Sequence, residues 1–355
     1  MRGMSVVLLL TSGAWCCAQE PSTKTQLGVA HIGGRYAFSE EDYLNEGAAK
    51  IRSLGARCIK VSLSLDTDNP SPKLYSFHSR WPDVATLDGL ADSPYYRALF
   101  ARDFDTFILT TFRPGKPAGY WRVRFTNFDE QAEEACFAAL AGYLLRTYAE
   151  SGKTFVLQNW EGDWAVRGGF DADTMPTNDA VANMARWLAA RQRGVDRARR
   201  NAGPGRARVF HACEVNLVRQ AADHGAPSVT VDVLPDVPVD LVSYSAWDTK
   251  DSPEDFGKAL NFIAKHRNPT PPFGKRGVYV GEFGLPESEA TPEQVLDRTR
   301  KLLAESMRFG CPYAVYWQLY CNEPVAKAPK ANTDFKGFWL VRPDGTRSPV
   351  CELFN

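Results

Sequence analysis

The chain has 355 residues, of which 44% are hydrophobic and 24% are charged, which is the composition of an ordinary globular protein. The 42 Lys and Arg residues balance the 42 Asp and Glu residues, so the charge argues against a nucleic-acid partner and against a membrane-surface protein. A chain of this length suits one large barrel-type domain or two smaller domains.

The first 18 residues have the pattern of a secretory signal peptide. Arg2 precedes an apolar stretch that begins at Val6, and small residues follow up to Ala18. The apolar stretch is too short to span a bilayer. We therefore expect a signal peptide over 1–18, a mature chain over 19–355 without a membrane span, and a secreted or periplasmic location.

Beyond the signal peptide, apolar strand-like runs alternate with helix-like segments. Most runs are near-continuous Val, Ile, Leu and Phe, as expected for parallel strands that are buried on both faces. The eight predicted strands are Leu27–Ile32, Cys58–Leu65, Thr106–Thr111, Thr154–Asn159, Arg208–Ala212, Asp240–Tyr244, Gly277–Gly281 and Tyr313–Trp317. With no internal repeat or linker, they predict one domain of the α/β class, a (β/α)8 TIM barrel over 19–355.

Helix-start signals lie between these strands. The run Ser39–Asp42 offers an N-cap with an acidic first turn. Ser93, Ser252 and Thr291 each precede a proline, which favours a helix beginning there. Apolar spacing predicts an amphipathic helix over Asp129–Tyr148.

Three further patterns give expectations about the helices, the C-terminus and the cysteines. The basic run Arg191–Arg200 has helical spacing and is expected to face solvent. The turn signal Pro343–Gly345 predicts a short C-terminal hairpin. Cys58 and Cys213 fall within apolar strands and are expected to be buried free thiols. Three cysteines near the C-terminus leave room for one disulfide, whose pairing the sequence does not give: Cys311, Cys321 and Cys351.

Carboxylates follow the fourth and seventh predicted strands. Glu161 lies in "NWEGDW" and Glu282 lies in "GEFG". In a parallel barrel the carboxyl ends of all strands surround one concavity, so these two side chains are expected to face each other. Glycoside hydrolysis uses such a pair, one group to protonate the leaving oxygen and one to attack the anomeric carbon. Aromatic rings beside them also suit a sugar, whose C–H faces stack on indole and phenol rings.

These motifs resemble those of the retaining (β/α)8 glycoside hydrolases of the cellulase-like clan, clan A, without assigning a family within it. The resemblance implies that Glu161 is the acid/base and Glu282 the nucleophile. It also implies that Tyr244 supports the nucleophile and that Trp317 forms the floor of the sugar site. In the clan an Asn commonly stands directly before the acid/base, whereas here Trp160 intervenes.

Several assignments have alternatives at this point. Strand alternation puts Asn159 on the same face as Glu161, and Asn216 or Asn322 are the other candidates for the sugar-binding amide. Asp163 and Glu214 are the alternatives for the acid. The full set of residues expected to bind substrate is His31, Arg35, Asn159, Trp160, Asp163, Trp164, His211, Tyr244, Trp247 and Trp317.

The sequence argues against metal chemistry. It has five histidines in all, no His-x-His follows the first strand, and no His-Glu-x-x-His, nucleophile elbow or phosphate-binding glycine loop is present. We expect no cofactor and a monomeric, secreted enzyme that cleaves a β-linked oligo- or polysaccharide with retention. The alternative is a carbohydrate-binding barrel that has lost catalysis.

Overall fold

The computed structural model describes residues 25–270, 273 and 277–354. The predicted signal peptide over 1–18 therefore lies outside the described residues. None of the described helices is long and apolar enough to cross a membrane.

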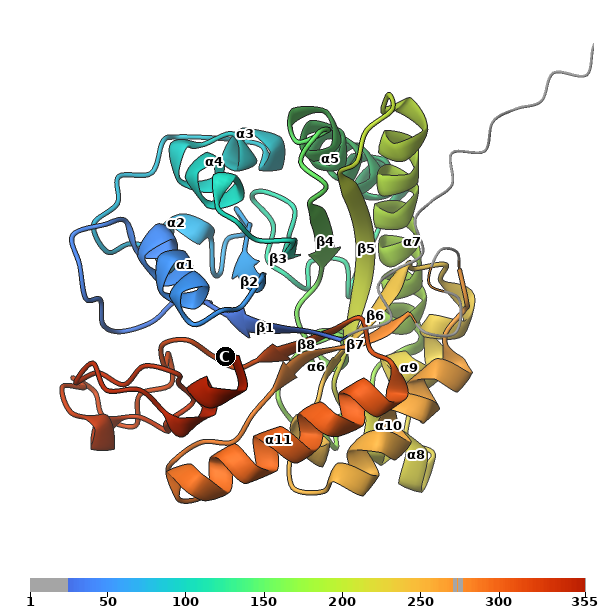
Figure 1. Cartoon of the computed structure of the whole chain (residues 1–355). Helices are drawn as coiled ribbons and strands as arrows, with labels where there is room; N and C mark the ends of the chain where they lie inside the picture. Colours follow the sequence, from blue (N-terminus) through green and yellow to red (C-terminus); the bar gives the residue numbers. More distant parts are fainter. Residues whose placement is uncertain (1–24, 271–272, 274–276, 355) are drawn as a thin grey trace, which may run out of the picture.

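Eight parallel strands form a closed barrel in the order β1 to β8, each paired with its neighbours in the sequence and β8 with β1 (Figure 1). This confirms the predicted (β/α)8 fold, and each predicted strand overlaps an observed one. The strands are β1 Gln26–Ala30, β2 Cys58–Ser62, β3 Thr106–Thr110, β4 Thr154–Gln158, β5 Arg208–Val215, β6 Leu241–Ser245, β7 Val278–Phe283 and β8 Tyr313–Tyr316.

Helices cover the outside of the barrel (Figure 1). The α-helices are α1 Tyr43–Ser53, α2 Ser71–Leu74, α3 Leu87–Ala91, α4 Pro94–Ala101, α5 Asn127–Thr147, α6 Gly162–Arg167, α7 Asn178–Asn201, α8 Val218–His224, α9 Val229–Asp232, α10 Pro253–His266 and α11 Pro292–Phe309. Short 3-10 turns are η1 Leu234–Asp236, η2 Trp247–Thr249, η4 Asn332–Asp334 and η5 Pro349–Phe354.

The local sequence explains where several helices begin. The side chain of Ser252 caps α10, and Thr291 with Gln294 forms a capping box at α11, each followed by proline in the first turn. The cap of α1 is Asp42, which accepts from the backbone N–H of Asn45, and not the earlier Ser39. Asp42 is placed to reach the free N–H groups of the first turn, which Ser39 is too far back along the chain to reach.

The strands alternate between two apolar layers. Outward-facing residues pack against the helices, while inward-facing residues fill the barrel interior, among them Ile108, Val156 and Val315. Polar side chains, including Lys60 and Gln158, then project inward further along the same strands. The polar site therefore lies above an apolar floor that excludes water from below.

Two expectations need correction. The basic run does not simply face solvent, because Arg191 is fully buried and pairs with Glu133 of α5 at 3.4 Å. Cys311, Cys321 and Cys351 are all free, like the buried Cys58 and Cys213, so no disulfide joins the cysteines of the described residues. The short C-terminal hairpin, by contrast, is present, because an antiparallel bridge between Val341 and Arg347 closes the predicted turn.

Candidate active site

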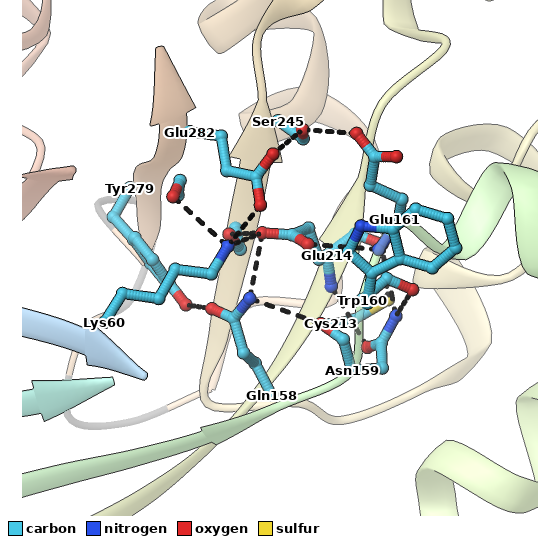
Figure 2. A network of polar contacts seen from close by, with 12 residues as sticks. Lys60, Gln158, Asn159, Trp160, Glu161, Cys213, Glu214, Ser245, Tyr279 and Glu282 are labelled. Carbon is cyan, nitrogen blue, oxygen red and sulfur yellow. Dashed lines mark hydrogen bonds and ion pairs between the residues drawn. The ribbon is translucent and has the colours of Figure 1, made fainter. Parts of the chain in front are cut away.

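Three glutamates and one lysine meet inside the barrel at the carboxyl ends of the strands (Figure 2). Lys60 comes from β2, Glu214 from β5 and Glu282 from β7, and Glu161 follows β4 directly. None is more than 6% exposed. This is the end of the barrel at which the sequence predicted an active site.

Glu161 occupies an unusual backbone position. It is the residue that precedes α6, with φ of 22° and ψ of 79°. A positive φ at a residue with a side chain costs of order 1–3 kcal/mol and persists only where the surroundings fix it. Here the backbone N–H of Glu161 donates to Oε2 of Glu214 at 3.0 Å, so a buried carboxylate holds this strained residue in place.

One hydroxyl joins the two predicted catalytic glutamates. The Oγ of Ser245 at the end of β6 lies 2.6 Å from Oε1 of Glu161 and 3.1 Å from Oε2 of Glu282. Because both distances meet at one atom, these two carboxyl oxygens lie no farther apart than the sum of 2.6 and 3.1 Å. Retaining glycosidases have carboxyl groups about 5–5.5 Å apart, and inverting enzymes about 6.5–9.5 Å. Ser245 thus brings one oxygen of each glutamate within hydrogen-bonding reach of the same hydroxyl.

Glu282 is held by a cation on its other oxygen. The Nζ of Lys60 donates to Oε1 of Glu282 at 2.8 Å and to Oε1 of Glu214 at 2.9 Å. The indole N–H of Trp247 donates to Oε2 of Glu282 at 3.1 Å. The nucleophile proposed from the sequence therefore has its orientation fixed by three donors, from Lys60, Ser245 and Trp247.

The site gives the two glutamates different affinities for protons. Burial raises the pKa of Glu161 well above its ordinary value, and the negative charge of Glu282 raises it further. Burial also raises the pKa of Glu282, but the adjacent ammonium group of Lys60 opposes that effect. The two neighbouring carboxylates keep the pKa of Lys60 above its usual value despite burial. Glu161 is thus the group favoured to hold a proton while Glu282 ionises.

A cavity of about 480 Å³ opens beside Glu282. Its wall combines Lys60 and Glu282 with the indole rings of Trp160 and Trp317. A volume of this size, with apolar walls and a few polar groups, is typical of a small-ligand site. Glu161 is not part of the wall and lies beyond Ser245. The remaining lining residues are Ile32, Ser62, Asp66, Asp68, Asn69, Leu74, Thr110, Phe112, Ala118, Asn322 and Glu323.

Aromatic side chains continue outward from this cavity. The ring of Phe170, which is 75% exposed, lies 5.8 Å from that of Trp160 and 6.1 Å from that of Trp164. Trp317 donates to Glu323 at 3.4 Å. Trp160 of the "NWEGDW" segment therefore lines the cavity, and Trp164 is linked to it through a shared contact with a phenylalanine that the sequence did not single out.

The structure turns three other predicted residues away from the cavity. Tyr244 faces out of the barrel, where its hydroxyl contacts Asp248 and its ring packs on Phe256 of α10. It does not contact Glu282, whose partners are Ser245 and Trp247 instead. His211 also faces outward, to Gln192 of α7, and the Nε2–H of His31 donates to the backbone carbonyl of Tyr43 under α1.

Asn159, Asp163 and Arg35 likewise lie away from the cavity wall. The Asn159 amide oxygen accepts the backbone N–H of Glu214 at 3.1 Å, which ties β4 to β5. Asp163 is fully buried and accepts backbone N–H groups of two later segments, from Asn216 at 3.0 Å and Val229 at 2.8 Å. Arg35 is exposed. None of these three residues is among those that line the cavity.

Sequence reasoning did not select Lys60 or Ser245 and treated Glu214 only as an alternative acid. A signal for Lys60 was present, because a lysine within the apolar strand "CIKVS" must find a charged partner when buried. Ser245 gave no comparable signal, since serine is common at strand ends. Among the described residues, no three His, Cys, Asp or Glu side chains are arranged to hold a metal ion.

No protein-family model and no curated protein matches this sequence. Solved structures do match its fold. An exo-β-1,4-mannosidase from Opitutaceae bacterium strain TAV5 superimposes with a TM-score of 0.57 at 13% identity, covering 93% of this chain and 58% of that one. A GH5_18 protein from Bifidobacterium longum subsp. longum ATCC 55813, in complex with Manβ1-4GlcNAc, superimposes with a TM-score of 0.57 at 15% identity. The match covers 93% of this chain and 77% of that one.

A GH5-4 broad specificity endoglucanase from Clostridium acetobutylicum gives a TM-score of 0.55 at 13% identity, with 94% of this chain and 97% of that chain covered. This chain thus spans only 58% of the mannosidase but nearly all of the endoglucanase. At such identities the comparison shows a shared fold. The predicted resemblance to clan A glycoside hydrolases is confirmed at that level.

Proposed function

We propose that the protein is a glycosidase that cleaves a β-linked oligo- or polysaccharide with retention of anomeric configuration. The observation that carries the proposal is the contact of Glu161 and Glu282 with one hydroxyl, that of Ser245, at 2.6 and 3.1 Å. A double displacement uses two carboxyl groups about 5–5.5 Å apart, and the shared contact with Ser245 supports that mechanism. The shared barrel fold of the glycoside hydrolases supports the same function.

The reaction would proceed in two steps. In the first, a carboxylate oxygen of Glu282 forms a bond to the anomeric carbon, while Glu161 gives its proton to the departing glycosidic oxygen. In the second, Glu161 takes a proton from water, whose oxygen attacks the anomeric carbon and breaks the ester bond to Glu282. The raised pKa of Glu161 serves the first step, because the acid must hold its proton at the working pH.

The charge of the cavity favours a neutral sugar. Its ionisable lining consists of four carboxyl groups and the ammonium of Lys60, which is already paired with Glu214 and Glu282. A uronic acid would therefore meet like charge and find no free cation in the wall. The aromatic rings of Trp160 and Trp317 suit the C–H face of a neutral ring. We propose that the enzyme acts outside the cytoplasm, as the predicted signal peptide over 1–18 indicates.

A panel of 4-nitrophenyl β-glycosides and β-linked polysaccharides tests the activity, with Glu161→Gln beside the unchanged chain. We expect cleavage of a neutral glycoside, a β-anomer as the first product by ¹H NMR, and little cleavage of the β-glucuronide. An α-anomer as the first product would contradict retention.

A carbohydrate-binding barrel without catalysis is the second candidate. The position of Asn159 favours it, because the residue nearest to the clan's sugar-binding Asn contacts Glu214 and not the cavity. Glycan binding by calorimetry, with no cleavage of any member of the panel, would establish this function and reject the first.

A further inference from the structure

Glu214 lies at the centre of the polar network and is fully buried. Three donors converge on its Oε1: Nζ of Lys60 at 2.9 Å, Nε2 of Gln158 at 2.9 Å and Oγ of Ser243 at 2.8 Å. Its Oε2 accepts the backbone N–H of Glu161 at 3.0 Å. A carboxylate with donors on both oxygens is the form that these contacts stabilise. The contacts of Glu214 therefore suit a hydrogen-bond acceptor and not a proton donor.

The same carboxylate reaches both proposed catalytic residues. It contacts the backbone of Glu161 directly, and it shares the ammonium group of Lys60 with Glu282 (Figure 2). We propose that Glu214 is a positioning residue: its ionised carboxylate fixes the strained backbone of Glu161 and, through Lys60, the side chain of Glu282. This inference rests on the proposed glycosidase function, in which those two glutamates react.

The chain makes room for this arrangement at Gly281. A Cβ at that position would lie 1.8 Å from Oγ of Ser243 and 2.7 Å from Oε1 of Glu214. The strand pairing between β6 and β7 also shifts just before Glu282, where Ser245 pairs with Glu282 while Tyr244 pairs with Val280. The glycine and the shift together let Glu282 point inward above the Glu214 carboxylate.

The charge of Glu214 also bears on which glutamate holds a proton. The titratable groups that act on Glu161 are Glu282 of β7, Glu214 of β5 and Lys60 of β2. The negative charge of Glu214 raises the pKa of Glu161 and that of Glu282, and the positive charge of Lys60 lowers both. With Glu214 balanced by Lys60, the remaining pair can share one negative charge, which is the state that the first reaction step needs.

The test is a carboxyl ¹³C NMR titration of the chain labelled at glutamate, with the Glu161 resonance assigned by its loss in Glu161→Gln. In Glu214→Gln we expect Glu161 to titrate at lower pH than in the unchanged protein. In Lys60→Gln we expect the opposite displacement, to higher pH. The opposite signs keep the proposal testable if one of the two variants fails to fold.

The matched control is Glu133→Gln, which removes another fully buried carboxylate at a distance from the site. It is expected to leave the titration of Glu161 unchanged. If Glu161 titrates alike in the unchanged protein, Glu214→Gln and Lys60→Gln, with each variant folded by circular dichroism, the proposed coupling is overturned.

The variant Glu214→Asp distinguishes the effect of the position of the Glu214 carboxylate from the effect of its charge. This variant keeps the charge but is one methylene too short to reach all four donors. We expect kcat on the cleaved glycoside to fall about 100-fold with a smaller change in KM. Because the charge is kept, Glu161 should titrate at the same pH as in the unchanged protein. An unchanged kcat in both Glu214→Asp and Glu214→Gln would reject the positioning role. A protein that cleaves no glycoside would instead reject the proposed function, and the NMR titration would still decide the coupling.

Discussion

Two buried ion clusters lie on opposite sides of the barrel wall, and they differ in charge balance. Outside the barrel, Glu133 of α5 pairs with Arg191 of α7, one carboxylate to one guanidinium. Arg191 also stacks on Phe137 and Trp187, with its guanidinium carbon 4.0 and 4.3 Å from the ring centres. Inside the barrel, the ammonium group of Lys60 pairs with Glu214 and Glu282, and its charge also acts on Glu161.

The comparison shows what each cluster is suited to do. A one-to-one buried pair joins two helices and leaves no group short of a counter-charge. The inner cluster has more carboxyl groups than cations, so one of them is favoured to keep a proton. Such an unequal set costs stability, and on the proposed mechanism it supplies an acid and a nucleophile side by side.

The largest expected effect is that of Glu282→Gln. If Glu282 forms the covalent bond to the sugar, its amide analogue should lower kcat by on the order of 10⁴-fold or more. Glu133→Gln, the equivalent change outside the barrel, should leave the kcat of the folded protein near that of the unchanged chain. Steady-state kinetics on the best cleaved 4-nitrophenyl glycoside measures both. Comparable losses in the two variants would mean that burial, and not chemistry, explains the effect.

Gly281→Ala should have the next largest effect on kcat, because the new methyl group would collide with Ser243 and Glu214. We expect kcat to fall about 100-fold as the glutamates are displaced. Gly203→Ala is the matched control, since a Cβ there meets nothing within 4 Å. Equal activity in the two variants would show that the close packing at Gly281 has no role in the site.

Breaking the outer pair should affect stability alone. Glu133→Ala leaves Arg191 buried without its partner, which should lower the free energy of unfolding by about 3–5 kcal/mol. The activity of the molecules that remain folded should be unchanged. Urea unfolding followed by fluorescence gives the first quantity, and kinetics below the transition gives the second. Loss of activity in the folded protein would indicate that the two clusters are coupled.

The smallest effect expected is a gain of stability in Glu161→Gln. Because the pKa of Glu161 is raised in the folded state, the folded protein binds this proton more tightly than the unfolded chain. Its contribution is therefore most favourable below the ordinary pKa of 4.5 and is lost as pH rises through the folded value. Glu161→Gln should melt at higher temperature than the unchanged chain at neutral pH, with a difference that disappears under acidic conditions. A lower melting temperature at neutral pH would contradict the raised pKa.

The sequence was sufficient to predict the barrel because each buried strand is a short apolar run with a clear boundary, as in "TFILT" and "TFVLQ". It was also sufficient to bring Glu161 and Glu282 to the same end of the barrel, since that follows from strand order. It was not sufficient to show which neighbours face inward. The clan resemblance placed Tyr244 beside the nucleophile, whereas the alternation of β6 turns Tyr244 outward and Ser245 inward.

On β5 the sequence likewise did not show which side chains face inward. Ala212 faces the barrel interior, so the preceding residue, His211, faces α7. Asn159 shows a further one. Strand alternation was extended past the end of β4 to Glu161, yet the chain there leaves the extended conformation, as its positive φ shows. The alternation of side chains therefore holds within β4, which ends at Gln158, and cannot be extended to Glu161 beyond the strand end.

Ser245 donates a single hydrogen, although it lies within bonding distance of two carboxyl groups. It can donate to only one of them at a time, and the group that carries the negative charge is the better acceptor. On the proposed mechanism it would donate to Glu282 before the first step and to Glu161 after the first step, once Glu282 carries the sugar. The hydroxyl would thus rotate once in each direction per turnover, following the negative charge from Glu282 to Glu161 and back.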